Sequence, residues 1–203
     1  MTVECPSVRR ARSPDGRLLV MVNPLPLDSP RWDELSTRMG REGRQVRKTL
    51  QALSASPSQV ELFREMWPEL CSEGTTYEAA YAAAPYLVAA AERVSRPDGL
   101  EFLIVLGLIA TDATHVPEDL APAYDRALTQ ALALSLDRLM DCPTDQTLRY
   151  LLSAAAAFRG RTDLGATLAD LDAVQEPCPT CGTVVFPGEL REVTERDRAE
   201  TAR

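Results

Sequence analysis

The residues with the clearest chemical potential are two cysteines near the end of the sequence, Cys178 and Cys181, in the run Cys-Pro-Thr-Cys-Gly. Two thiolates separated by two residues, with proline between them and glycine after them, form the tight knuckle that lets both sulfurs reach one Zn²⁺. The apolar run that follows, residues 184–186, suits the strand of a zinc ribbon. The pattern therefore predicts Cys178 and Cys181 as metal ligands and zinc as the cofactor.

A complete zinc ribbon needs a second knuckle, and the sequence contains none. The remaining candidate ligands complete the site only if the fold brings them close; these are Cys5, Cys71, His115 and Cys142. A partner chain could supply the missing pair, and a spare thiol pair in a remnant ribbon is the alternative. A thioredoxin-type redox pair is disfavoured, because such a pair starts a helix beside a βαβ unit and this one follows a predicted helix.

Acid–base catalysis would have to use His115, the single histidine, with Asp112 nearby in the sequence. A lone histidine at a helix end is more often a cap or a surface residue. Two carboxylate pairs fall in predicted first helical turns, where the helix dipole explains them: Asp33 with Glu34, and Glu118 with Asp119. The sequence also lacks a nucleophile elbow, a Walker loop and a dinucleotide fingerprint. We therefore predict no catalytic residues and no enzyme activity.

The charge is uneven along the chain. Ten basic and six acidic residues precede residue 49, whereas twelve basic and twenty-four acidic residues follow, for a net charge of −8. A basic row lies in the first predicted helix: Arg38, Arg41, Arg44, Arg47 and Lys48. The row could meet phosphates, but the overall negative charge favours a solvated face and argues against nucleic acid as the partner. Tyr77, Tyr81 and Tyr86 are interpreted as packing residues rather than a base-stacking platform.

Cysteine usage and hydropathy indicate the compartment. The five cysteines are odd in number and irregular in spacing, unlike a secreted disulfide framework. The longest apolar run, residues 102–110, is about half of the roughly 20 residues that span a bilayer. We expect a cytoplasmic protein that does not contact the membrane.

The elements that would position these residues are helices. Ser29 and Pro30 predict a helix start, and a first helix is expected over residues 32–53, with a break near Gly40 and Gly43. A second helix starts after Ser56-Pro57 and is divided by Pro68. Gly74 ends it, a threonine caps the next helix, and an alanine-rich helix runs to residue 94.

Residues 96–99 (Arg-Pro-Asp-Gly) are interpreted as a turn. The run 103–110 is apolar on every side and predicts a central buried helix, with a buried strand as the alternative. A long amphipathic helix follows over residues 120–139. Residues 142–145 end it and start another, which Gly160 ends, and a last helix carries Leu164 and Leu168.

The predicted fold is all-α, with about seven helices in a short α-solenoid of HEAT-like pairs. The pairs span residues 32–71, 77–114 and 117–158, which suggests a period of about 40 residues. Three regions result: a non-helical arm or small hairpin at 1–29, a helical domain at 30–176, and a tail at 177–203 that carries the cysteine pair.

One stretch resembles a known family. The run Leu-Cys-Ser-Glu-Gly-Thr-Thr-Tyr at 70–77, followed by an alanine-rich segment ending Pro-Tyr-Leu at 85–87, resembles a group of bacterial HEAT-repeat-like proteins of mostly unassigned role. The resemblance covers residues 32–112. That group usually has His-Gln where this sequence has Ser72 and Glu73, so no role of that histidine transfers. The resemblance implies a helical stack with a binding function and no chemistry.

The sequence therefore predicts a non-enzymatic module that binds another protein, and the acidic body suits a partner with a basic surface. An immunity, antitoxin or regulatory role fits the size and acidity. The alternative is a zinc-dependent regulatory or nucleic-acid-associated protein that uses Cys178 and Cys181. The sequence does not fix the oligomeric state.

Overall fold

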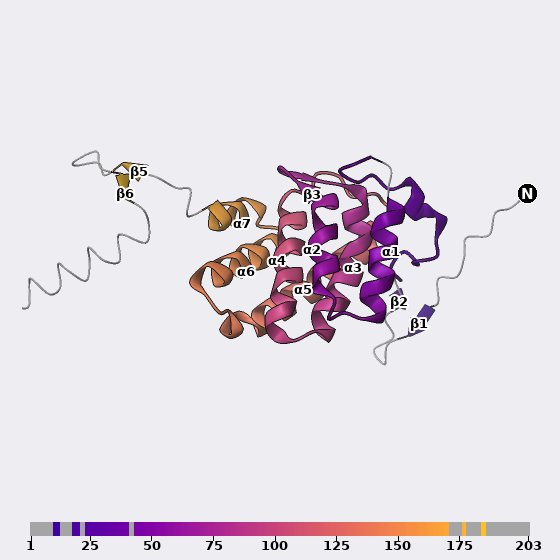
Figure 1. Ribbon diagram of the computed structural model, residues 1–203, viewed down its shortest axis with the longest axis horizontal. Coiled ribbons are helices and arrows are strands. Elements are labelled where there is room, and N and C mark those ends of the chain that lie inside the picture. The colour runs from indigo at the N-terminus through magenta and orange to yellow at the C-terminus, as the bar shows by residue number, and fades with distance from the viewer. Residues whose placement is uncertain are drawn as a thin grey trace, which may run out of the picture.

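A computed structural model describes residues 23–40 and 43–170, together with the backbone of four short strands outside them. Strands β1 (Arg10–Arg12) and β2 (Leu18–Val20) pair antiparallel, as do β5 (Glu176–Pro177) and β6 (Val184–Val185). Between them the chain is helical, and its seven α-helices confirm the all-α prediction (Figure 1).

The first predicted helix is two elements. Ser29 caps as expected, accepting a hydrogen bond from the Arg31 amide at 3.3 Å, but it opens only a short 3₁₀ helix, η1 (Pro30–Glu34). An irregular stretch separates η1 from α1 (Gly43–Ala55). Gly40 has φ +104°, and a Cβ at Gly43 would lie 2.1 Å from the Trp32 carbonyl oxygen. The predicted break near Gly40 and Gly43 is confirmed, because these glycines let the chain fold back onto η1. Residues 35–40 are not helical, so the helical part of residues 32–53 is shorter than predicted.

Helix α2 (Val60–Met66) continues as the 3₁₀ helix η2 (Trp67–Glu69), so Pro68 divides the second helix as predicted. The prediction that a threonine caps the following helix was wrong, because the residue before α3 is Tyr77 and its side chain makes no capping hydrogen bond. Instead, β3 (Cys71–Ser72) and β4 (Thr75–Thr76) pair antiparallel across a two-residue turn. Glu73 and Gly74 both have positive φ, at 52° and 72°, as the turn types that match strand twist require.

Helix α3 (Glu78–Arg93) contains Pro85 and is followed closely by α4 (Arg96–Thr111). The turn predicted at residues 96–99 is the first turn of α4, since the side chain of Ser95 accepts a hydrogen bond from the Asp98 amide at 3.4 Å. The apolar run 103–110 is helical and mostly buried, so the buried-helix interpretation is confirmed and the strand alternative is wrong.

Helices α5 (Ala121–Asp137), η3 (Leu139–Asp141), α6 (Asp145–Phe158) and α7 (Thr162–Ala169) complete the described chain. The Thr144 hydroxyl accepts a hydrogen bond from the Thr147 amide at 3.1 Å and caps α6. Gly160, at φ +74°, ends α6 as predicted. On the surface of α6, Leu152 is 39% exposed.

The helices lie in two layers, with α1, α3 and α5 in one and α2, α4 and α6 in the other (Figure 1). Helix α1 packs on α2, α3 on α4 and α5 on α6 across the layers, and the core lies between them. The rings of Phe63 on α2 and Phe102 on α4 stack with centroids 4.2 Å apart. Gly107 of α4 lies against Ala154 of α6. These contacts join successive pairs side by side.

A buried arginine joins the end of α5 to the end of α3. Arg138 is 4% exposed, and its guanidinium donates to the Ala91 carbonyl at 2.7 Å. Gly99 provides the room, because a Cβ there would lie 1.7 Å from Arg138 Nη1. Burial lowers the pKa of Arg138, and the nearby Arg96 charge lowers it further. Within the described ranges, no helix combines the length and apolarity needed to cross a membrane.

Candidate functional site

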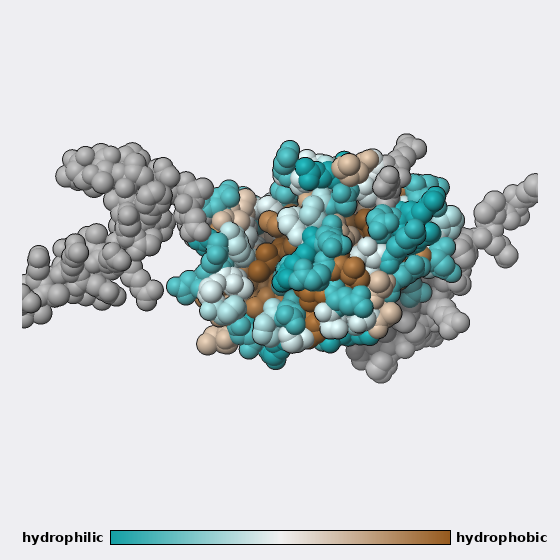
Figure 2. Space-filling view, in the orientation of Figure 1, coloured by the Kyte–Doolittle hydropathy of each residue, from teal (hydrophilic) through white to brown (hydrophobic). Residues whose placement is uncertain are grey.

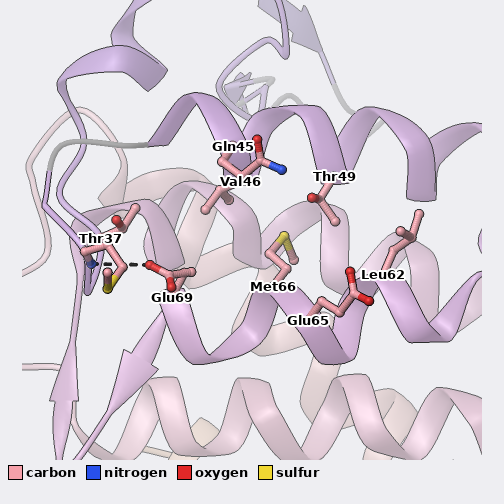
Figure 3. Close-up of a pocket in the computed structure, with 9 residues that line it drawn as sticks. Thr37, Gln45, Val46, Thr49, Leu62, Glu65, Met66 and Glu69 are labelled. Atoms are coloured by element: carbon pink, nitrogen blue, oxygen red, sulfur yellow. Dashed lines mark hydrogen bonds between the residues drawn. The ribbon is translucent and has the colours of Figure 1, made fainter.

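An opening in the described part of the chain lies between α1 and α2, and we call it the α1–α2 groove (Figure 3). Its volume is about 280 Å³. Nine residues line it: Thr37, Met39, Gln45, Val46, Thr49, Leu62, Glu65, Met66 and Glu69. The side chains of α1 and α2 point toward each other across the opening, and the loop before α1 closes one end (Figure 3).

Helical spacing explains why these residues share one surface. Leu62, Glu65 and Met66 are three and four positions apart on α2, and Glu69 follows one turn later on η2, so they lie on one face. Val46 and Thr49 are one turn apart on the facing side of α1. The floor is apolar, since Val46 is 1% exposed and Met66 is 5% exposed.

Two carboxylates carry all the charge of the lining. Glu69 Oε2 accepts a hydrogen bond from the Met39 amide at 3.3 Å, which fixes the loop at the closed end. Glu65 is exposed on the rim and has no ion pair or hydrogen bond with any described residue. Met39 is 73% exposed at the same end. The groove therefore offers an apolar floor with negative charge on its rim.

A second depression, the hairpin groove, lies beside the β3–β4 turn and has a volume of about 330 Å³. It is lined by Arg38, Trp67, Pro68, Cys71, Ser72, Glu73, Gly74, Leu108 and Asp112. Apolar surface shows over α4 in Figure 2, and Leu108 on this helix is 37% exposed. Arg38 Nη2 lies 3.9 Å from Glu73 Oε1.

The thiol of the hairpin groove is unsuited to nucleophilic chemistry. Cys71 is 3% exposed, and burial, followed by the charge of Asp112, raises its pKa to about 12. Burial also raises the pKa of Asp112. A neutral thiol is a poor nucleophile and a poor metal ligand at neutral pH. The arrangement of this groove suits packing or binding.

The predicted metal ligands, Cys178 and Cys181, lie outside the described residues. The other candidates are scattered: Cys71 is buried beside the turn, Cys142 is half-buried after η3, and His115 is exposed between α4 and α5. Over 23–40 and 43–170, no group of three or more His, Cys, Asp or Glu side chains could hold a metal ion.

The basic row does not form one helix face. Arg38 precedes α1 and pairs with Glu73, and Arg44 lies 3.3 Å from Asp33. Arg41 lies outside the described residues. The prediction that all five residues share a helix was wrong for Arg38, because the chain turns at Thr37–Gly40.

The predicted carboxylate pairs are engaged on the surface. Asp33 lies in the first turn of η1, as expected. Asp119 precedes α5 rather than lying in its first turn, and it accepts a hydrogen bond from Arg31 Nε at 3.1 Å. Arg31 also pairs with Glu34 at 3.2 Å. Asp33, Glu34 and Asp119 therefore serve surface ion pairs.

Two of the three predicted packing tyrosines are confirmed as such. Tyr81 is 2% exposed, and its ring meets Tyr124 edge-on at 5.1 Å. The Tyr86 hydroxyl donates to the Leu25 carbonyl at 2.6 Å, beside Trp32. Burial raises the pKa of Tyr81, Tyr86 and Tyr124.

The sequence interpretation did not identify the α1–α2 groove. The signal that could have found it is Glu65, an exposed charge one turn after Leu62 at the edge of the apolar face of α2. No family model, curated protein or solved structure matches the chain.

Proposed function

We propose that the chain is a non-enzymatic protein-binding module, built as a short α-solenoid of HEAT-like helix pairs, and that the α1–α2 groove is its binding surface. The partner is another protein with a basic surface, and an immunity, antitoxin or regulatory role in the cytoplasm fits such a module. The pairing of consecutive helices and the two layers support the solenoid. The observation that carries the proposal is the apolar floor with a carboxylate rim.

An enzyme is a weaker explanation of the same surface. Catalytic sites bring a nucleophile, a base and an oxyanion-stabilising group within reach of one reacting atom. The α1–α2 groove offers carboxylates without a neighbouring nucleophile, and the hairpin groove holds a thiol that burial keeps neutral. Both grooves suit recognition better than turnover.

Site-specific photo-crosslinking in the source cells tests the proposal. A photoreactive residue at Gln45, on the groove rim, should crosslink to one protein, whereas the same residue at Arg159, exposed after α6, should not. The crosslinked protein should also form a stable complex with the purified chain. Equal crosslinking from both positions, or none from Gln45, contradicts the proposal.

The second candidate is a zinc-dependent regulatory or nucleic-acid-associated protein, and the Cys178/Cys181 knuckle in the sequence favours it. One zinc per chain in the wild-type protein, lost in Cys178→Ser, would support it. Metal-free wild-type protein after purification under reducing conditions with added zinc would contradict it.

A further inference from the structure

We infer that the α1–α2 groove takes one apolar side chain that lies next to a lysine or arginine, on an extended segment of the protein partner. This inference rests on the proposed function and names the chemistry of the segment that the groove recognises.

The size of the groove limits its occupant. Sites that enclose small molecules occupy about 300–1,000 Å³ and bury most of the ligand. At about 280 Å³ the α1–α2 groove lies just below this range, and it is only partly enclosed. It therefore suits one anchoring side chain better than a cofactor.

The floor selects an apolar anchor. Val46 and Met66 are buried, and Leu62 lies half-buried at the edge. Methionine side chains are flexible and polarisable, so they adapt to the shape of an inserted side chain. Met39 is 73% exposed at the closed end and is placed to cover the anchor.

The rim selects a positive neighbour. Glu65 and Glu69 are four residues apart on one face, and both line the groove. Glu69 is already engaged by the Met39 amide, but Glu65 has no partner among the described residues. A lysine or arginine beside the anchor would pair with Glu65, whereas a phosphate backbone or an acidic peptide would be repelled.

The polar residues of the rim supply a place for the segment's backbone. Thr49 on α1 lies opposite Glu65 across the groove, and Gln45 lines the groove one turn earlier on α1 (Figure 3). An amide and a hydroxyl can both donate and accept hydrogen bonds, so they can pair with the peptide groups of an extended chain whatever its other side chains are.

Methionine-methyl NMR with defined peptides tests the inference. The probe is a short Gly-Ser peptide with a central Lys-Leu-Lys; the controls replace that centre with Glu-Leu-Glu or Lys-Ser-Lys. The Met39 and Met66 methyl signals should shift with Lys-Leu-Lys and much less with either control. The signal of Met140, which is 95% exposed and does not line the groove, should stay fixed.

Charge variants test the role of the rim. Glu65→Gln should weaken binding of the Lys-Leu-Lys peptide on the order of fivefold, within the range measured for partly exposed ion pairs. The matched change Glu118→Gln, at an exposed carboxylate outside the groove, should leave the affinity unchanged. Equal weakening by both variants would contradict the inference.

Other outcomes would also overturn it. These are equal shifts with the Glu-Leu-Glu peptide, or Met39 and Met66 shifts that depend on protein concentration without peptide, which would identify a second copy as the occupant. A partner crosslinked from Gln45 with no peptide-induced shift defeats this inference alone. Absence of both crosslink and shift defeats the proposed function as well.

Discussion

The contact between α4 and α6 leads to a sharp prediction for Gly107→Ala. A Cβ at Gly107 would lie 2.3 Å from the Cβ of Ala154 and 2.6 Å from its Cα. These distances are far below van der Waals contact, and both helices are held by their own backbones. The substitution must therefore push apart the helices that join successive pairs.

The magnitude is the difference of two terms. Overpacking a core costs about 1–3 kcal/mol, and distances this short place the change near the upper end. Alanine in place of glycine returns about 1 kcal/mol of helix propensity. The net loss is about 2 kcal/mol, which lowers the melting temperature by roughly 4–8 °C for a chain of this size.

Thermal and denaturant unfolding followed by circular dichroism measure this loss. Ala133→Gly, at an exposed position of α5, reports the propensity term in this protein and should cost about 1 kcal/mol. Adding Ala154→Gly to Gly107→Ala removes the shorter contact but leaves the one at 2.6 Å, so the rescue should be partial. A Gly107→Ala variant as stable as the wild type, or more stable, would refute the α4–α6 contact.

Three further predictions concern the rest of the described chain. Burial raises the pKa of Cys71 from 9.0 to about 12, so its contribution to stability is complete below pH 9 and is lost as the pH rises toward 12. Between pH 9 and 12 the melting temperature of Cys71→Ala should therefore fall less steeply than that of the wild type. Equal slopes for the two proteins would contradict the burial of the thiol. Gly74→Ala places a side chain at φ +72° and should lower the free energy of unfolding in urea by about 1 kcal/mol, whereas Glu73→Asn at φ 52° should leave it unchanged or raise it. An unchanged free energy of unfolding in Gly74→Ala would contradict the β3–β4 turn. Arg138→Met leaves the Ala91 carbonyl without its buried donor and should cost about 1–3 kcal/mol by the same unfolding assay, a loss that the matched exposed change Arg159→Met should not reproduce.

Most helices could be predicted from local sequence signals, because the residues that start and end a helix act on the backbone next to them. Thr144 begins α6 and Gly160 ends it, and both act within one turn of their own position. The run 103–110 identified a buried helix because it is apolar on all sides and the predicted elements around it are helical. The Pro-Asp-Gly signal at 97–99 misled the interpretation, since proline and aspartate also favour the first turn of a helix.

The segments that were predicted wrongly are held by contacts between residues far apart in the sequence. Gly43 lies against the Trp32 carbonyl, and the Tyr77 amide donates to the Leu70 carbonyl at 3.0 Å across the β3–β4 turn. Neither contact follows from periodicity. The α1–α2 groove needs two helices to face each other at a fixed separation, so its residues could be assigned to helix faces but not to one surface.

The most direct test of the central claim is the affinity of the crosslinked partner for a chain whose α1–α2 groove is filled. Thr49→Trp places an indole over the groove floor and leaves Glu65 and Glu69 unchanged, while Thr129→Trp makes the same change at an exposed site on α5. Calorimetric titration should show that Thr49→Trp weakens binding by at least about tenfold, the loss expected when a buried anchor is displaced, and that Thr129→Trp binds like the wild type. Equal affinities for all three proteins would show that the partner binds elsewhere.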